Sequence, residues 1–407
     1  MKSNWQTKRL EEICELFADG DWIEKKDQSK GGIRLIQTGN IGNGHFLNRA
    51  GKARYISEET FKRLRCAEVL PGDCLLSRLP DPVGRASLIP KTGHKMITAV
   101  DCTIMRFKKD TLPEWFIYYS LSQGYQNEIN KEVTGATRQR ISRSNLGNIK
   151  IPVPPVSEQQ QLVNILDAVF ERTATAKENA EKNLQSAHEL FESYLQSVFE
   201  NGNCEVKKLS ELFDVQSSRR VHKADWKTEG IPFYRAREVV KLARNGFVNN
   251  ELFISQELFN EFTKDKGAPK KNDIIISAVG TLGECYLVRE EDRFYIKDAS
   301  VLWFSKISNV DSAYIEYSFK SQIVQSQVMN KSMGATVGTL TISRAKNIEI
   351  PIPPLKEQQA IVNKLDLLSA ETKKLESIYQ QKLTDLEELR KSILQKAFNG
   401  DLAGACS

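Results

Sequence analysis

The sequence IPVPPVSEQQ, from Ile151 to Gln160, returns as IPIPPLKEQQ from Ile350 to Gln359. The two copies are 199 residues apart. With this offset, Gly135–Asp167 matches Gly334–Asp366 at 17 of 33 positions without a gap. Self-similarity at a fixed offset is the sign of a repeated structural unit. The chain is therefore predicted to be a tandem duplication.

The repeat extends to both borders of each copy. The pattern LQ-x-x-F occurs at Leu195–Phe199 and again at Leu394–Phe398, and TKRLEEI at Thr7–Ile13 is answered by VKKLSEL at Val206–Leu212. Two units of 199 residues account for 398 of the 407 residues. Between these borders the match is much weaker, which indicates a retained frame around two diverged domains.

Each proline string predicts the start of a long helix, because proline can begin a helix but does not continue one. In the first copy, Ser157 and Gln160 have the form of a capping box, which the second copy lacks because Lys356 replaces the serine. Apolar residues then recur at alternating spacings of four and three, with a flaw at Lys177. Gly202 and Gly400 are suitable helix stops.

These heptads predict two helices of about 45 residues, each about 65 Å long at about 1.5 Å per residue. Because the helices are equivalent by duplication, we expect them to pair as an antiparallel coiled coil about a pseudo-twofold axis. The N-terminus would then lie near the end of the second helix. The predicted segments are a first domain at 1–150, a central long helix at 151–203, a second domain at 204–349, and a C-terminal long helix with its tail at 350–407.

The two large segments are predicted to be mixed α/β domains, so the fold class is α/β with two domains separated by the coiled-coil helices. Turn residues bound strand-like runs, and two amphipathic stretches indicate helices. The expected strands are Cys74–Leu79, Ala99–Phe107, Ile274–Val279 and Ser300–Phe304, and the expected helices are Glu114–Asn130 and Ser312–Asn330.

Composition excludes several classes of protein. No apolar run approaches the roughly 18 residues that cross a bilayer, and the N-terminus lacks the apolar core of a signal peptide. We therefore expect a cytoplasmic protein that is not associated with a membrane. Seven cysteines include no C-x-x-C pair, which argues against a disulfide framework or a zinc site and favours core positions. The chain has a net charge of +6, with 25 basic and 17 acidic residues in 1–150, and 22 and 19 in 204–350. A basic excess in the large segments suits a polyanionic partner.

Motifs for catalysis are missing from the sequence. It has no P-loop, no H-E-x-x-H pattern among its four histidines, and no NPP-aromatic motif of an amino-methyltransferase. His188 lies on the predicted central helix, where a surface role is expected. The sequence therefore indicates a binding protein and not an enzyme.

Arginine-bearing loops are the candidate DNA-contacting sites, because guanidinium groups bind phosphate and guanine in a bidentate manner. In the first domain these loops are RLPDPVGR at 78–85 and TRQRISR at 137–143, and Gln37–Asn40 forms another polar turn. In the second domain we aligned Tyr234–Arg237 with Gln37–Asn40. The predicted DNA-binding residues are Arg78, Arg85, Arg138, Arg140, Arg143, Gln37, Thr38, Asn40, Arg235, Arg237 and Arg344. We expect no catalytic and no metal-binding residues.

The chain resembles the specificity subunits of Type I restriction–modification systems. The residues that carry the resemblance are the paired IP-[VI]-PP-x-x-EQQ strings, the heptad helices ending in LQ-x-x-F, the segment Gly72–Arg85, and the GAT strings at Gly135–Thr137 and Gly334–Thr336. Essentially the whole chain is covered. One departure is that the second copy has Ala278–Gly283 in place of the PDPVGR loop.

This resemblance implies two target recognition domains that each read one half of a bipartite double-stranded DNA site. The long helices would set the half-site spacing and dock two methyltransferase subunits. Restriction subunits would complete the complex, and S-adenosylmethionine, ATP and Mg would be bound by those partners and not by this chain. The alternative is a coiled-coil adaptor that does not bind DNA, which heptads and modest charge fit equally well.

Overall fold

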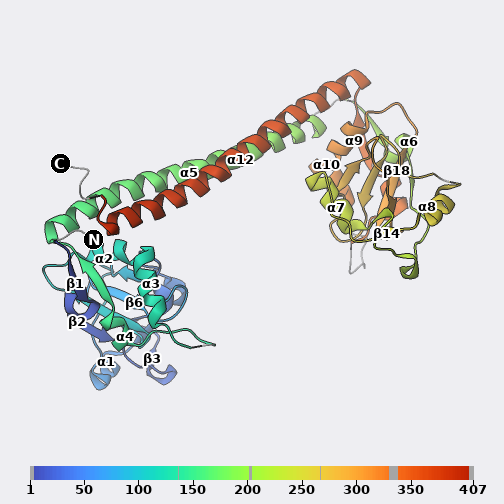
Figure 1. The fold of residues 1–407 in the computed structure, drawn as a ribbon. Coiled ribbons are helices and arrows are strands. Elements are labelled where there is room, and N and C mark those ends of the chain that lie inside the picture. The colour runs from blue at the N-terminus through green and yellow to red at the C-terminus, as the bar shows by residue number, and fades with distance from the viewer. Residues whose placement is uncertain (1–3, 136, 201–203, 266, 330–337, 403–407) are drawn as a thin grey trace. The chain divides into compact units, whose positions relative to one another are not determined.

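The structure is a computed structural model that describes residues 4–135, 137–200, 204–265, 267–329 and 338–402. It divides into two compact units, the first formed by Met1–Glu181 with Gln380–Ser407 and the second by Lys182–Tyr379. Each unit holds one α/β domain and a segment of both long helices, as Figure 1 shows. The expected helix stop Gly202, the second GAT string and Cys406 lie outside the described residues.

The first domain consists of short strands and helices at the following positions. Its strands are β1 Gln6–Arg9, β2 Cys14–Asp19, β3 Gln28–Ser29, β4 Ile33–Ile36, β5 Arg54–Ile56, β6 Cys74–Ser77, β7 Ala86–Leu88, β8 Met96–Thr98, β9 Cys102–Phe107 and β10 Lys150–Val153. Its α-helices are α1 Glu58–Leu64, α2 Pro113–Ser120, α3 Gln123–Glu132 and α4 Arg143–Asn148, and its 3-10 helices are η1 Leu10–Ile13, η2 Lys25–Asp27, η3 Thr38–Asn40 and η4 Ala50–Lys52.

The second domain has a similar order of elements but no counterpart of β3. Its strands are β11 Glu205–Lys208, β12 Phe213–Gln216, β13 Ile231–Tyr234, β14 Phe253–Ile254, β15 Ile274–Ser277, β16 Cys285–Leu287, β17 Tyr295–Ile296, β18 Val301–Lys306 and β19 Glu349–Ile352. Its helices are α6 Leu209–Leu212, η5 Lys223–Asp225, α7 Ala236–Asn245, α8 Gln256–Thr263, α9 Ser312–Ser318, α10 Gln322–Met329 and α11 Ile342–Lys346.

The larger sheet has the same topology in the two domains, while the smaller sheet has the extra strand β3 in the first. The first has an antiparallel sheet in the order β2-β9-β6-β7, and the second has β12-β18-β15-β16. A smaller sheet in each contains one parallel pair, β4 with β8 and β13 with β17. The predicted α/β class and tandem duplication are confirmed, and the duplication includes the regions where the two sequences have diverged.

Two predicted helices are each divided in the structure. The expected helix Glu114–Asn130 consists of α2 and α3, and the expected helix Ser312–Asn330 consists of α9 and α10. In the first domain Ser122 separates the two helices. Its backbone is extended, and its hydroxyl accepts a hydrogen bond from the Tyr125 amide as the N-cap of α3. The prediction of single helices was wrong because a serine inside a helical pattern was not treated as a cap.

The two long helices are α5 Val156–Glu200 and α12 Leu355–Asn399. They pair antiparallel in each unit. In the first unit Arg390 lies over the Phe170 ring and Lys177 pairs with Glu387. In the second unit His188 pairs with Glu376, and Lys364 lies over the Tyr194 ring. The predicted antiparallel pairing is confirmed, and the polar Lys177 in the heptad stripe is accommodated by its ion pair.

Helix ends follow the predictions only in part. Gly400 has a left-handed backbone with φ of 88° directly after α12, as expected of a helix stop. The expected capping box at Ser157 is wrong, because α5 already begins at Val156 and the Pro155 carbonyl accepts from the Glu158 and Gln159 amides. The backbone carbonyl of Pro155 thus accepts the first hydrogen bonds of the helix.

The glutamines of the EQQ strings join each long helix to its domain. Gln159 is fully buried, and its amide group donates to the carbonyls of Pro154 and Asp110 while accepting from the Leu112 amide. Gln358 makes the corresponding contacts with Pro353 and Asp311. The strongest sequence signal of the chain is therefore a structural joint.

We predict that Gln159→Ala lowers the free energy of unfolding by about 2–3 kcal/mol, because it leaves buried backbone groups without partners. Urea unfolding monitored by tryptophan fluorescence would measure this. The matched control is Gln160→Ala, whose exposed side chain only contacts Asn164 one turn away, with an expected change within about 0.5 kcal/mol. Equal effects of the two substitutions on the free energy of unfolding would contradict the role of Gln159 in joining α5 to its domain.

The LQ-x-x-F motifs insert the far end of each long helix into a domain core. Leu394 and Phe398 of α12 lie in the core of the first domain with Trp5 and Trp115, and Leu195 and Phe199 of α5 lie in the core of the second. Trp5 and Phe398 share one core, so the N-terminal segment packs near the end of the second helix, as predicted.

Several cysteines are core residues, as expected. Of the described cysteines, Cys14, Cys66, Cys74, Cys102 and Cys285 are buried, and burial raises the pKa of the Cys14 thiol to about 12. Among the described helices, none has a stretch that is long and apolar enough to traverse a bilayer.

Candidate nucleic-acid interface

The predicted contact residues of the first domain meet at one end of its sheets. Strands β2, β4, β6 and β8 end there, and β9 begins there after the connection 99–101. Backbone hydrogen bonds hold the loops together: the Ala99 amide donates to the Ile36 carbonyl, and the Arg78 amide to the Asp101 carbonyl, both at 2.9 Å. The sheet edge therefore positions loops that are far apart in the sequence.

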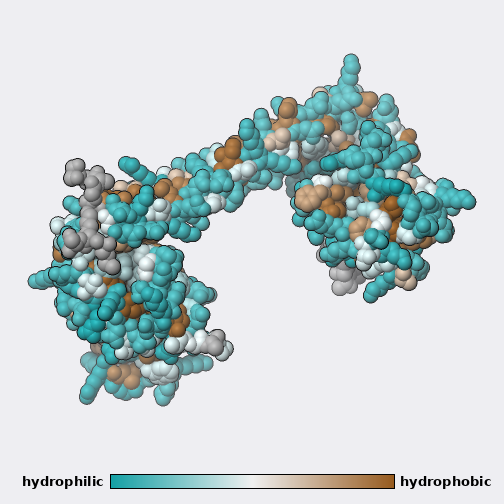
Figure 2. All heavy atoms as spheres, viewed as in Figure 1, coloured by the Kyte–Doolittle hydropathy of each residue, from teal (hydrophilic) through white to brown (hydrophobic). Residues whose placement is uncertain are grey.

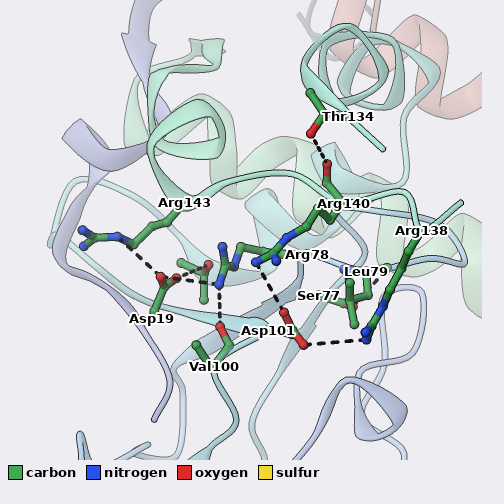
Figure 3. A network of polar contacts seen from close by, with 11 residues as sticks. Asp19, Ser77, Arg78, Leu79, Val100, Asp101, Thr134, Arg138, Arg140 and Arg143 are labelled. Carbon is green, nitrogen blue, oxygen red and sulfur yellow. Dashed lines mark hydrogen bonds and ion pairs between the residues drawn. The ribbon is translucent and has the colours of Figure 1, made fainter. Parts of the chain in front are cut away.

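Arginines and aspartates form a network at this end, as Figure 3 shows. Arg138 and Arg140 lie 3.9 and 3.7 Å from the carboxylate of Asp101. Arg143 lies 3.8 Å and Arg78 3.5 Å from the carboxylate of Asp19. The network thus has four guanidinium groups and two carboxylates, and it keeps a positive excess.

The outer three arginines, Arg138, Arg140 and Arg143, are more than half exposed. Their ion pairs are long, and exposed ion pairs of this kind contribute about 0–1 kcal/mol. These guanidinium groups are therefore weakly held and can exchange a carboxylate for a phosphate or a base edge at little cost.

Arg85, a predicted DNA-contact residue, is buried in the loop that follows β6. It is 8% exposed, and its guanidinium donates to the carbonyls of Thr38, Ile41, Leu79 and Pro82. Burial lowers its pKa. The side chain therefore connects the 78–85 loop to the 37–41 turn.

Arg78 is likewise buried, at 4% exposure, and donates to the Val100 carbonyl. Its Nε atom is buried and has no hydrogen-bond partner among the residues that the structure describes. Strand β6 ends just before Arg78, and the side chain lies against the connection 99–101, where it bonds to the Val100 carbonyl. Whether Arg78 or Arg85 contacts DNA stays a prediction.

The polar turn of the first domain is half-buried and shaped by its own side chains. Asn40 accepts from the Gln37 amide at 3.0 Å and donates to the Leu47 carbonyl at 2.9 Å. The Thr38 carbonyl is held by Arg85. The Gln37 side chain makes no hydrogen bond among the described residues, so it is the member of this turn with donors and an acceptor to offer a ligand.

In the second domain the corresponding turn follows β13, and the structure corrects our alignment by one residue. The Arg235 amide is bonded to Glu238 as the Gln37 amide is to Asn40, so Arg235 and Glu238 are the equivalent pair. The Arg235 guanidinium also donates two hydrogen bonds to the Glu238 carboxylate, at 3.0 and 2.8 Å. Arg237 contacts Glu238 and Glu251.

These contacts fix the charge of Glu238. Burial favours its neutral form, but the hydrogen bonds from Arg235 and Arg237 outweigh burial, and the pKa of this carboxyl is lowered. Arg235 and Arg237 are thus more tightly paired than the outer arginines of the first domain. Arg344 is held by the carbonyls of Thr339 and Val328 at 2.6 and 2.9 Å.

The loops after β6 and β15 are equivalent in spite of their different sequences. The Gly84 amide donates to the Ser77 carbonyl, and the Gly283 amide to the Ser277 carbonyl. Both glycines have left-handed φ angles of 80° and 82°. The second loop is one residue shorter and places Glu284 where the first has Arg85, so the buried arginine contacts do not transfer to it.

Four further residues of these sheet ends were missed from the sequence. Asp19 and Asp101 organise the arginines of the first domain, and Arg220 of the second domain pairs with Asp298 at 2.9 Å. Isolated aspartates carry no pattern in the sequence. The signal for Arg220 was the Arg219–Arg220 pair after a strand-like run.

The family model for the Type I restriction modification DNA specificity domain matches residues 2–185 and 201–385 of the chain. The chain belongs to this family. The match in two copies agrees with the duplication and includes both sheet ends described above. The predicted resemblance is therefore confirmed.

Other specificity proteins resemble the chain over most of its length. A putative Type I restriction enzyme specificity subunit of Haemophilus influenzae is 29% identical over 63% of this chain, a region that covers 65% of that protein, slightly less than two thirds. The EcoKI specificity subunit of Escherichia coli is 24% identical, with 91% of this chain and 82% of that protein covered. A solved structure of a Type I restriction–modification system has a chain with a TM-score of 0.77, 18% identity and 99% coverage of both chains, which shows the same fold.

Metal-binding groups are not part of this specificity fold in the residues that the structure describes. In these ranges no three His, Cys, Asp or Glu side chains are placed to hold an ion. The chemistry that the sheet ends offer is hydrogen bonding and charge, which is the chemistry of DNA recognition.

Proposed function

We propose that the chain is the DNA-recognition subunit of a Type I restriction–modification complex, in which each domain reads one half of a bipartite site. The observation that carries the proposal is the arginine network at the sheet end of a domain that belongs to a DNA specificity family. The exposed guanidinium groups of Arg138, Arg140 and Arg143 supply contacts to phosphate and to base edges, and Gln37 supplies an amide for a base edge.

The long helices are proposed to set the half-site spacing and to dock two methyltransferase subunits. Along α12 several apolar side chains stay exposed, among them Leu367 at 65% and Ile378 at 49%, and Figure 2 shows hydrophobic residues along the helices on the face in view. Exposed apolar residues on a helix suit a protein partner. Restriction subunits would join through this complex, while S-adenosylmethionine, ATP and Mg would be bound in the partners.

The proposal is tested by fluorescence anisotropy with a labelled duplex and the chain assembled with its methyltransferase partner. Binding that weakens steeply with salt is expected, because phosphate neutralisation releases counterions. Binding that is absent, or that does not change between about 50 and 200 mM salt, would favour a coiled-coil adaptor instead.

We predict that lengthening both helices by one heptad changes the spacer of the DNA site and leaves the half-sites unchanged. The insertions would follow Glu178 in α5 and Asp385 in α12, which keeps the register indicated by the Lys177–Glu387 pair. Seven residues add about 10 Å, or about 3 base pairs at 3.4 Å each. Mapping of methylated adenines would measure the spacer, and an altered half-site sequence would contradict the role of the helices.

A further inference from the structure

An acidic residue occupies the same connection in both domains. Asp101 directly precedes β9, in the connection from β8, and Asp298 lies in the connection from β17 to β18. Each is bonded to arginine: Asp101 pairs with Arg138 and Arg140, and Asp298 with Arg220. These connections lie at the sheet end that carries the candidate interface.

The arginines come from different places in the two domains. Arg138 and Arg140 precede α4, whereas Arg220 lies in the loop after β12. Both connections thus hold an acid, but not at the equivalent position, because the Ala278 amide donates to the Ser300 carbonyl as the Arg78 amide does to the Asp101 carbonyl. What the two connections share is a carboxylate placed against exposed arginine side chains at the candidate interface.

Stability does not explain the first of these pairings. Arg138 is 73% exposed, Arg140 51% and Asp101 26%, and the distances of 3.9 and 3.7 Å are long. Such pairs contribute about 0–1 kcal/mol at most. A carboxylate among arginines also repels a polyanion, so it reduces the affinity of this surface for DNA in general.

We propose that Asp101 is a specificity-determining residue that competes with DNA for Arg138 and Arg140. This inference rests on the proposed function. Non-specific DNA can engage these arginines only by displacing the carboxylate, which then faces phosphate oxygens. A cognate half-site compensates, because its base edges accept from the arginines while an exocyclic base amino group donates to the released carboxylate. Rejection of wrong sequences by an uncompensated charge is a recognised route to specificity.

We assign Asp298 this role for the second half-site through Arg220, because its partner is 70% exposed at the equivalent sheet end. The pair is shorter, at 2.9 Å, and Asp298 is the less exposed acid of the two. Each domain then has its own carboxylate that competes with DNA for arginine, and each domain distinguishes its cognate half-site from other sequences independently.

The test uses Asp101→Asn and Asp298→Asn chains assembled with the methyltransferase partner. Dissociation constants would be measured for a duplex with the bipartite motif, for two duplexes with one half-site scrambled, and for a fully scrambled duplex. Asp101→Asn is expected to tighten binding to the scrambled duplex about fivefold and to reduce discrimination at one half-site about tenfold. Asp298→Asn is expected to reduce discrimination at the other half-site.

The control is Asp110→Asn, because Asp110 is an exposed acid paired with Lys8 at 3.2 Å beyond the opposite end of β9. It should leave discrimination unchanged, and melting curves would establish that all variants are folded. Unchanged discrimination in folded Asp101→Asn, or relaxation of the same half-site by both variants, would overturn the inference alone. If the unmodified complex binds the motif duplex no more tightly than the scrambled duplex, both the proposed function and this inference are overturned.

Discussion

Replacing Arg138, Arg140 and Arg143 together by glutamine is expected to weaken DNA binding by the assembled complex about a hundredfold at low salt. Three exposed guanidinium groups are removed, and each charge-assisted hydrogen bond to phosphate or a base contributes on the order of 1 kcal/mol or more. Each lost phosphate contact also reduces the slope of log K against log salt by about 0.9, so the slope should fall by up to about 2.7. Fluorescence anisotropy across a salt series measures both quantities.

The matched control for this triple variant replaces three lysines by glutamine: Lys108 and Lys109, which follow the opposite end of β9, and Lys8 of β1, which pairs with Asp110 there. It removes the same charge from the same domain. If the two variants weaken binding equally, net charge and not the arginine network accounts for affinity. An unchanged affinity in the arginine variant would contradict the assignment of the interface.

Arg85→Ala is expected to destabilise the first domain by about 3 kcal/mol. The substitution removes donors from four carbonyls in a buried position and leaves a cavity between the 78–85 loop and the 37–41 turn. Arg138→Ala is the control, because the 73% exposed side chain of Arg138 should change the free energy of unfolding by no more than about 0.5 kcal/mol.

Chemical unfolding with domain-resolved hydrogen exchange would show whether the loss from Arg85→Ala is confined to the first domain. If Arg85→Ala unfolds like the unmodified chain but binds DNA less well, Arg85 is a contact residue and its carbonyl bonds are incidental. Loss of stability with retained binding at low temperature would show that Arg85 positions the loops.

The frame of the molecule was predictable from the sequence because it depends on repeated local patterns. A proline string, heptads and LQ-x-x-F recur at one offset, and each acts through neighbours in sequence or through one helix face. The antiparallel pairing followed from the duplication. The division of the predicted helix at Ser122 was missed because serine also occurs inside helices. Its hydroxyl caps α3 only where the backbone of Ser122 is extended.

The interface was predictable only as a set of loops. Exposed arginines such as Arg138 and buried ones such as Arg85 both lie in turn-rich loops of the sequence. What distinguishes them is whether carbonyls from distant segments converge on the guanidinium, and this depends on the sheet order. Asp101 was missed for the same reason, since its role arises from loops that the sheet end brings together.

We propose that this chain determines which DNA sequence a methyltransferase complex methylates. The direct measurement is a genome-wide map of methylated adenine in cells that express the methyltransferase subunit with and without the chain. The account predicts one split motif that appears only with the chain. A soluble complex of the two proteins that produces no new motif would contradict it.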